Sequence, residues 1–127
     1  MAYTIMIVDD SALMRQVIAK TLNVAGVAIG KLLEAANGRE ALDLLRQDWV
    51  DLVFSDINMP EMNGLELLKQ MAADDMLKSV PVVVISTERS EARAAELKAA
   101  GVKEIIRKPF TPETIKSVVD RLLSGGG

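Results

Sequence analysis

A chain of 127 residues, half of them hydrophobic and only four aromatic, is long enough for one domain with an aliphatic core. The formal net charge of −3 argues against a nucleic-acid-binding surface. The absence of Cys and His excludes disulfides, zinc sites with thiolate or imidazole ligands, and phosphohistidine on this chain. No apolar run approaches the roughly 20 residues of a membrane span and no signal-peptide pattern opens the chain, so we expect a cytoplasmic protein without membrane contact.

Apolar runs and helical periodicity alternate along the chain. The apolar runs predict strands over 5–8, 29–35, 52–55, 82–85 and 104–106. Apolar residues at helical spacing predict helices over about 11–25, 37–47, 63–71, 91–100 and 111–122. Capping residues support four of the helix starts: Asn37 with Glu40 in a capping box, Asn63, Ser90, and Thr111 followed by Pro112.

Strand and helix alternate five times, which is typical of an α/β fold with a parallel sheet and helices on both faces. Right-handed crossovers bring the carboxyl ends of the strands to one edge of such a sheet, where ligands bind. We expect a single domain over residues 1–124. The Gly run at 125–127 has the composition of a frayed end, a linker stub or an expression remnant.

Polar side chains follow four of the predicted strands. Asp9 and Asp10 come after the first strand, Asp56 after the third, Ser86 after the fourth and Lys108 after the fifth. Three carboxylates at one edge repel each other and are tolerable together only beside a cation. Oxygen ligands without His or Cys favour Mg²⁺, or Mn²⁺, over zinc or copper.

These residue types together suit phosphoryl transfer to a carboxylate. Asp56 would form an acyl phosphate, while the cation, Lys108 and the Ser86 hydroxyl would stabilise charge on the transferring oxygens. Each feature also has a plainer explanation on its own, because Asp9 and Asp10 could cap a helix and Asp56 could be a turn acid. Their co-occurrence at one edge favours the functional interpretation.

Four motifs carry a resemblance to a known family. They are I-M-I-V-D-D-S-A-L-M-R at 5–15, S-D-I-N-M-P-E-M-N-G at 55–64, P-V-V-V-I-S-T-E at 81–88 and R-K-P-F at 107–110. The chain resembles a response-regulator receiver domain of two-component signalling, in its stand-alone chemotaxis (CheY-like) form. The resemblance implies a doubly wound, five-stranded (βα)5 flavodoxin-like fold with strand order 2-1-3-4-5.

The resemblance also implies how the phosphoryl site would work. Asp56 would accept the phosphoryl group from a phosphohistidine on a sensor histidine kinase. Mg²⁺ would be bound by Asp10, Asp56 and the backbone carbonyl of Asn58, with Asp9 acting through a bound water. Lys108 would pair with the phosphoryl group.

Further residues would tune this site by the same resemblance. Ser86 would turn inward to the phosphoryl oxygen, and the Lys108–Pro109 bond would be cis. Asn58 and Glu88 occupy the positions that tune loss of the phosphoryl group.

Two positions depart from the family pattern. Ile105 stands where the family often places an aromatic switch residue, and Thr87 stands where it favours Ala or Gly. An aliphatic side chain at 105 can change its packing but offers no hydroxyl. The Ala-rich helix at 91–100 is compatible with two interpretations, a helix that shifts at low energetic cost or one that packs closely.

The implied function is a phosphorylation-controlled switch and not an enzyme, although the chain would support its own Mg²⁺-dependent phosphorylation and dephosphorylation. The surface of the fourth helix, fifth strand and fifth helix would bind a target protein, in chemotaxis or motility, and we expect a monomer. The alternative is a receiver domain from a multidomain regulator such as a transcription factor. An aspartyl phosphatase would need an acid at Asn58, and a flavin-binding module would have to hold a phosphate beside Asp9 and Asp10, so neither is favoured.

Overall fold

A computed structural model describes residues 2–124 as a five-stranded parallel sheet in the order β2-β1-β3-β4-β5, with helices on both faces. The strands are β1 (Tyr3–Val8), β2 (Ile29–Ala35), β3 (Leu52–Ser55), β4 (Val82–Ser86) and β5 (Glu104–Arg107). The helices are α1 (Ala12–Val24), α2 (Gly38–Leu45), α3 (Gly64–Ala72), α4 (Glu91–Ala99) and α5 (Pro112–Val119), and α5 runs directly into a π-helical turn, η1 (Asp120–Ser124). The predicted fold class and strand order are confirmed, and the predicted Gly tail at 125–127 lies outside the described residues.

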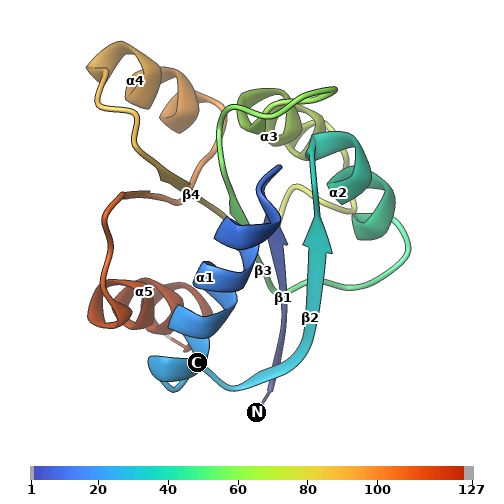
Figure 1. The fold of residues 1–127 in the computed structure, drawn as a ribbon. Coiled ribbons are helices and arrows are strands. Elements are labelled where there is room, and N and C mark those ends of the chain that lie inside the picture. The colour runs from blue at the N-terminus through green and yellow to red at the C-terminus, as the bar shows by residue number, and fades with distance from the viewer. Residues whose placement is uncertain (1, 125–127) are drawn as a thin grey trace.

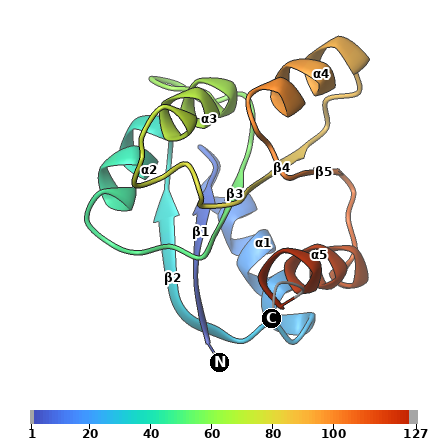
Figure 2. The ribbon, with the colours of Figure 1, turned by 180° about the vertical axis from the view of Figure 1, so that it is seen from behind.

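The sheet separates two apolar layers. α1 and α5 lie together on one side, and α2, α3 and α4 lie on the other, as Figures 1 and 2 show from opposite directions. Along β1, Ile5 and Ile7 enter the layer with α1 and α5, while Met6 and Val8 enter the layer with α2 and α3. This alternation explains why the strand has a continuous apolar sequence, since both of its faces are covered.

The helix starts follow from local capping. The Asn37 side chain accepts a hydrogen bond from the backbone N–H of Glu40, as expected. Glu40 in turn accepts from Ala36 N at 3.1 Å, one residue before the partner that the capping box predicts. The full capping box is formed at α3, between Asn63 and Glu66.

Two helices bury only a small part of their surface. Leu13 and Val17 belong to the apolar stripe of α1 but remain exposed, whereas Ile18 and Leu22 reach the core. The only buried residue of α4 is Leu97. Within residues 2–124, none of the helices combines the length and apolar character needed to span a bilayer.

The sequence pattern predicts a regular last helix to residue 122, but α5 is regular only to Val119. At its end the chain widens into the π-helical turn, where both Leu122 and Leu123 pack against the layer shared by α1 and α5. The widened turn thus brings two consecutive leucines onto one apolar layer.

Candidate functional site

Three carboxylates meet at the carboxyl edge of the sheet. β1 and β3 are paired neighbours, so Asp9 and Asp10 after β1 lie beside Asp56 after β3. One carboxylate oxygen from each of the three lies within 4.8 Å of the others. Asp9 is 2% exposed, Asp56 is half-buried and Asp10 is exposed. The sequence prediction that these side chains meet is confirmed; their roles as ligands and phosphoacceptor stay predictions.

The burial and the charges of this cluster perturb the pKa of Asp9. Burial raises the pKa of the Asp9 carboxyl above its ordinary value of 3.8, and the charges of Asp56 and Asp10 push it the same way. The hydrogen bond from Ser11 N and the positive charge of Lys108 lower this pKa and offset only part of the rise. Lys108 therefore lies close enough to Asp9 for their charges to interact, and its pairing with a phosphoryl group stays a prediction.

Backbone donors fix two of the three acidic side chains, Asp9 and Asp56. Asp9 Oδ1 accepts from Ser11 N at 2.9 Å, and Asp56 Oδ1 accepts from the backbone N–H of Ile57 at 2.8 Å. These bonds hold the carboxylates at the strand ends, so little side-chain freedom remains to be lost when a ligand binds.

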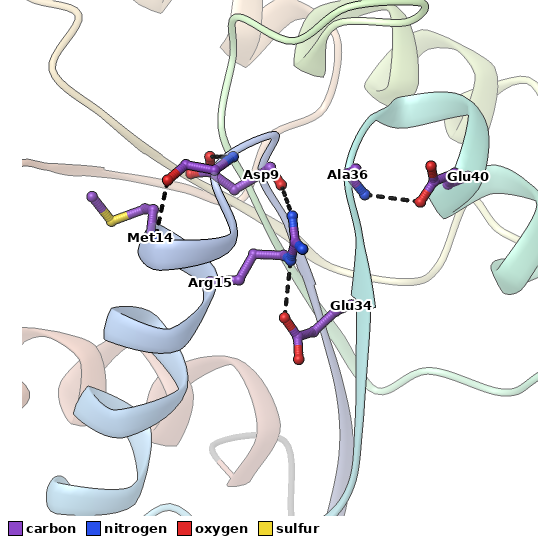
Figure 3. A network of polar contacts seen from close by, with 7 residues as sticks. Asp9, Met14, Arg15, Glu34, Ala36 and Glu40 are labelled. Carbon is purple, nitrogen blue, oxygen red and sulfur yellow. Dashed lines mark hydrogen bonds and ion pairs between the residues drawn. The ribbon is translucent and has the colours of Figure 1, made fainter.

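Arg15 braces the first of these strand ends. Its Nη1 donates to the backbone carbonyl oxygen of Asp9 at 2.6 Å, and its Nε pairs with Glu34 Oε1 at 2.9 Å. Figure 3 shows the guanidinium of Arg15 between the end of β1 and the side chain of Glu34 on β2. The sequence motif that contains Arg15 predicts no role for this residue, because its partners lie 6 and 19 residues away along the chain.

The loop after Asp56 packs tightly against the site. Gly64 N donates to Ile57 O at 2.7 Å, and a Cβ atom at Gly64 would lie 2.3 Å from the carbonyl oxygen of Asp56. Only glycine fits this approach. Asn58 lies exposed in the same loop, two residues after Asp56. The binding of Mg²⁺ by its backbone carbonyl stays a prediction.

Ser86 and Lys108 come from the adjacent strands β4 and β5. Lys108 N donates to Ser86 O at 2.9 Å, which joins these two strand ends. The buried Ser86 hydroxyl accepts a hydrogen bond from Glu88 N at 3.0 Å. The Lys108–Pro109 peptide bond is cis, as expected.

The two departures from the family pattern lie on different sides of the site. Ile105 is half-buried and packs against the layer that contains Leu97 of α4. Thr87 is exposed and, with Lys108, lines a hollow of about 470 Å³ whose other walls are Met14, Val17, Thr21, Pro109 and Phe110.

The donor set fits a hard divalent cation. Three converging carboxylates supply oxygen ligands only, and the chain holds no His or Cys to favour zinc or copper. Burial, and to a lesser extent the charges of Asp56 and Asp10, raise the pKa of Asp9, so a bound cation would stabilise its ionised form. An edge with few protein ligands also leaves room for water and for phosphate oxygens.

Comparison with known proteins agrees with this arrangement. The model of the response regulator receiver domain matches residues 5–120. The chemotaxis protein CheY homolog of Campylobacter jejuni is 40% identical over 123 residues, covering 96% of this chain and 93% of that protein. CheY1 of Helicobacter pylori J99 is 39% identical over 120 residues, which is 94% of this chain and 95% of that protein. The solved structure of Vibrio cholerae CheY4 superposes with a TM-score of 0.85 at 36% identity, covering 97% of this chain and 100% of that one.

Proposed function

Because this chain belongs to the response regulator receiver domain family and is homologous to CheY chemotaxis proteins, we propose that Asp56 is the phosphoacceptor of a phosphorylation-dependent signalling switch. The observation that carries this proposal is the convergence of Asp9, Asp10 and Asp56 beside Lys108. As in other members of this family, the phosphodonor would be a phosphohistidine on a histidine kinase; it would lie on another chain, because this one contains no His.

The proposed reaction transfers one phosphoryl group. A carboxylate oxygen of Asp56 attacks phosphorus, the bond from phosphorus to the donor imidazole nitrogen breaks, and its electron pair leaves with the imidazole. Ile57 N, which already donates to Asp56 Oδ1 at 2.8 Å, orients the carboxylate so that its other oxygen is free to attack. Lys108 and the Ser86 hydroxyl then contact phosphoryl oxygens.

We further propose that the acidic cluster binds Mg²⁺. Asp10, Asp56 and the backbone carbonyl of Asn58 would hold the ion, and the buried Asp9 would act through a bound water. When bound, Mg²⁺ supplies positive charge between the carboxylates and the phosphoryl oxygens. Mn²⁺ has the same ligand preference and is an alternative occupant.

The site acts on its own side chain, so we propose a switch that supports its own phosphorylation and hydrolysis and is not an enzyme for a separate substrate. An aspartyl phosphatase would need a general acid two residues after the nucleophile, and Asn58 cannot supply one. Asn58 and Glu88 would instead tune how long the phosphoryl group persists.

The partners are also proposed. A protein phosphodonor would dock on exposed apolar side chains of α1, Leu13 and Val17, beside the hollow that contains Lys108. The output surface would be formed by α4, β5 and α5, and would bind a target protein in chemotaxis or motility within the cytoplasm. We propose a monomer, with a receiver domain of a multidomain regulator as the less favoured alternative.

Intact mass after incubation with a small-molecule phosphodonor and Mg²⁺ tests the phosphoacceptor. We expect the wild type to gain one phosphoryl group only when Mg²⁺ is present, and the Asp56→Asn variant to gain none. Asp51→Asn is a matched control, because Asp51 flanks the opposite end of β3. A folded wild type that gains no mass, or an Asp56→Asn variant that still does, would contradict the proposal.

A further inference from the structure

Two arginines tie the loop after β4 to the end of β5. Arg107 Nη1 donates to the backbone carbonyl oxygen of Glu88, and Arg89 Nη2 donates to the backbone carbonyl oxygen of Lys108 at 3.2 Å. Each bond spans 19 residues. The two side chains reach in opposite directions, so each segment holds the backbone of the other.

Glu88 is held through both of its peptide groups. Its N–H donates to the Ser86 hydroxyl at 3.0 Å, and its carbonyl accepts from Arg107. Ser86 is 2% exposed, so this pair of bonds links a buried hydroxyl at the proposed phosphoryl site to the edge strand of the sheet. A guanidinium donor makes the second bond stronger than one between neutral groups.

Arg107 lies two residues beyond Ile105 on β5, so both side chains point to the same face of the sheet. They line one hollow of about 360 Å³, together with Ala94 and Lys98 of α4. Ile105 has no polar side-chain atom that could bind the loop after β4, whereas Arg107 donates a hydrogen bond to the Glu88 carbonyl in that loop. Leu97 is the only buried residue of α4, so apolar packing fixes the start of this helix weakly and the loop contacts matter more.

We propose that Arg107 is a positioning residue for the phosphoryl site, which fixes Glu88 and through it the Ser86 hydroxyl; this rests on the proposed function of Asp56. Rotation of Ser86 toward a phosphoryl oxygen breaks its bond with Glu88 N. Arg107 makes that rearrangement less favourable because it keeps the loop in place. Removing the Arg107 bond therefore shifts the equilibrium toward the arrangement in which Ser86 contacts the phosphoryl group.

The first test is amide hydrogen exchange by NMR, which needs no phosphoryl chemistry. We expect exchange at Glu88 N–H to be about tenfold faster in Arg107→Leu than in the wild type, since one charge-assisted hydrogen bond is lost. The matched control is Arg121→Leu, whose guanidinium pairs with Glu104 on the same strand and should leave Glu88 unchanged. Unchanged Glu88 exchange in Arg107→Leu would overturn the positioning role.

The second test is titration with beryllium fluoride in the presence of Mg²⁺, a mimic of a phosphoryl group on a carboxylate. We expect Arg107→Leu to bind about fivefold more tightly than the wild type, Arg107→Lys to return toward the wild type, and Arg121→Leu to match it. In a Ser86→Ala background, Arg107→Leu should have no effect, because the link through Glu88 N is already absent.

The outcomes separate the two proposals. Equal or weaker binding by Arg107→Leu, in a protein whose wild type binds, would overturn the role of Arg107 alone. A folded wild type that neither binds beryllium fluoride nor gains a phosphoryl group would contradict the function of Asp56 and with it this inference, whatever the exchange rates. If Arg107→Leu does not fold, Arg107→Gln removes the charge and carries the same expectations.

Discussion

At the scale of single residues, the buried carboxylate of Asp9 opposes folding. Its pKa is raised in the folded protein, so the folded state binds this proton more tightly than the unfolded chain does. The stability that the protonated group contributes is present below the ordinary pKa of 3.8 and is lost as pH rises through the raised value. At neutral pH Asp9 is therefore a source of instability when no cation is bound.

We expect Asp9→Asn to raise the free energy of unfolding at pH 7 by about 1 kcal/mol, because it removes a buried charge and keeps an oxygen for Ser11 N. The measurement is urea unfolding in a chelator, repeated from pH 4 upward, where the variant should lose less stability than the wild type. Asp43→Asn, at an exposed site, serves as the control. A variant less stable than the wild type at pH 7 would show that the charge of Asp9 is fully compensated.

The second residue-scale prediction concerns Gly64. Gly64→Ala would place a Cβ atom 2.3 Å from the carbonyl oxygen of Asp56, and backbone cannot move aside as a flexible side chain would. We expect a loss of about 2 kcal/mol or more in unfolding free energy, together with slower phosphorylation, because the displaced carbonyl belongs to the proposed phosphoacceptor. Gly26→Asn is the control, since Gly26 has a φ of 81° that Asn tolerates and nothing lies near its Cβ position. Wild-type stability in Gly64→Ala would contradict the close approach.

Residue types at strand ends were enough to predict that Asp9, Asp10 and Asp56 converge, because strand ends share an edge in any parallel sheet. The contacts of Arg15 and Arg107 could not be predicted in this way. Each joins its partner through a long flexible side chain across the fold, and no local pattern records which carbonyl lies within reach.

At the scale of elements, periodicity predicted every strand and helix. For most elements both predicted ends lie within about two residues of the observed ones, as is usual for such patterns. It could not say which part of a stripe is buried. The stripe of α1 is wider than the contact that the helix makes with the sheet, so Ile18 and Leu22 fill the core while Leu13 and Val17 face outward. The π-helical turn after α5 was also outside what a regular 3.6-residue pattern could predict.

The exposed part of α1 leads to a prediction about phosphotransfer. We expect Val17→Lys to slow phosphorylation by a protein phosphodonor at least fivefold, because a charge would enter an apolar docking surface, while phosphorylation by a small molecule stays unchanged. Gln16→Lys adds the same charge one residue earlier on the same helix and serves as the control. Equal slowing with both kinds of donor would place the effect at the site itself instead of at docking.

At the scale of the whole molecule, alternation of elements predicts a parallel sheet, but it leaves the order of the strands open. The order 2-1-3-4-5 came from the family resemblance alone, because local sequence does not encode which strands pair across crossovers. The structure confirms that order and thereby makes β1 and β3, the strands that precede the three carboxylates, paired neighbours.

Trp49 lies at the edge away from the carboxylates, before β3 begins, and its indole N–H donates to Asp51 Oδ1 at 3.0 Å. Seven residues of mostly extended chain put it roughly 20 Å from Asp56. We expect its fluorescence not to respond to Mg²⁺ or phosphorylation. A Trp49→Phe, Phe110→Trp variant, with the indole beside Lys108, should respond. A response from Trp49 in the wild type would reveal a rearrangement that crosses the entire sheet.

The crowding of the three carboxylates also bears on turnover in the cell. A fold that opens more often exposes cleavable backbone to proteases more often, and cleavage of the open form tracks its population. The divalent cation supply would then set the lifetime of this protein as well as its signalling. Under cation starvation we expect its abundance to fall, so degradation would act as a slow second input to the same site.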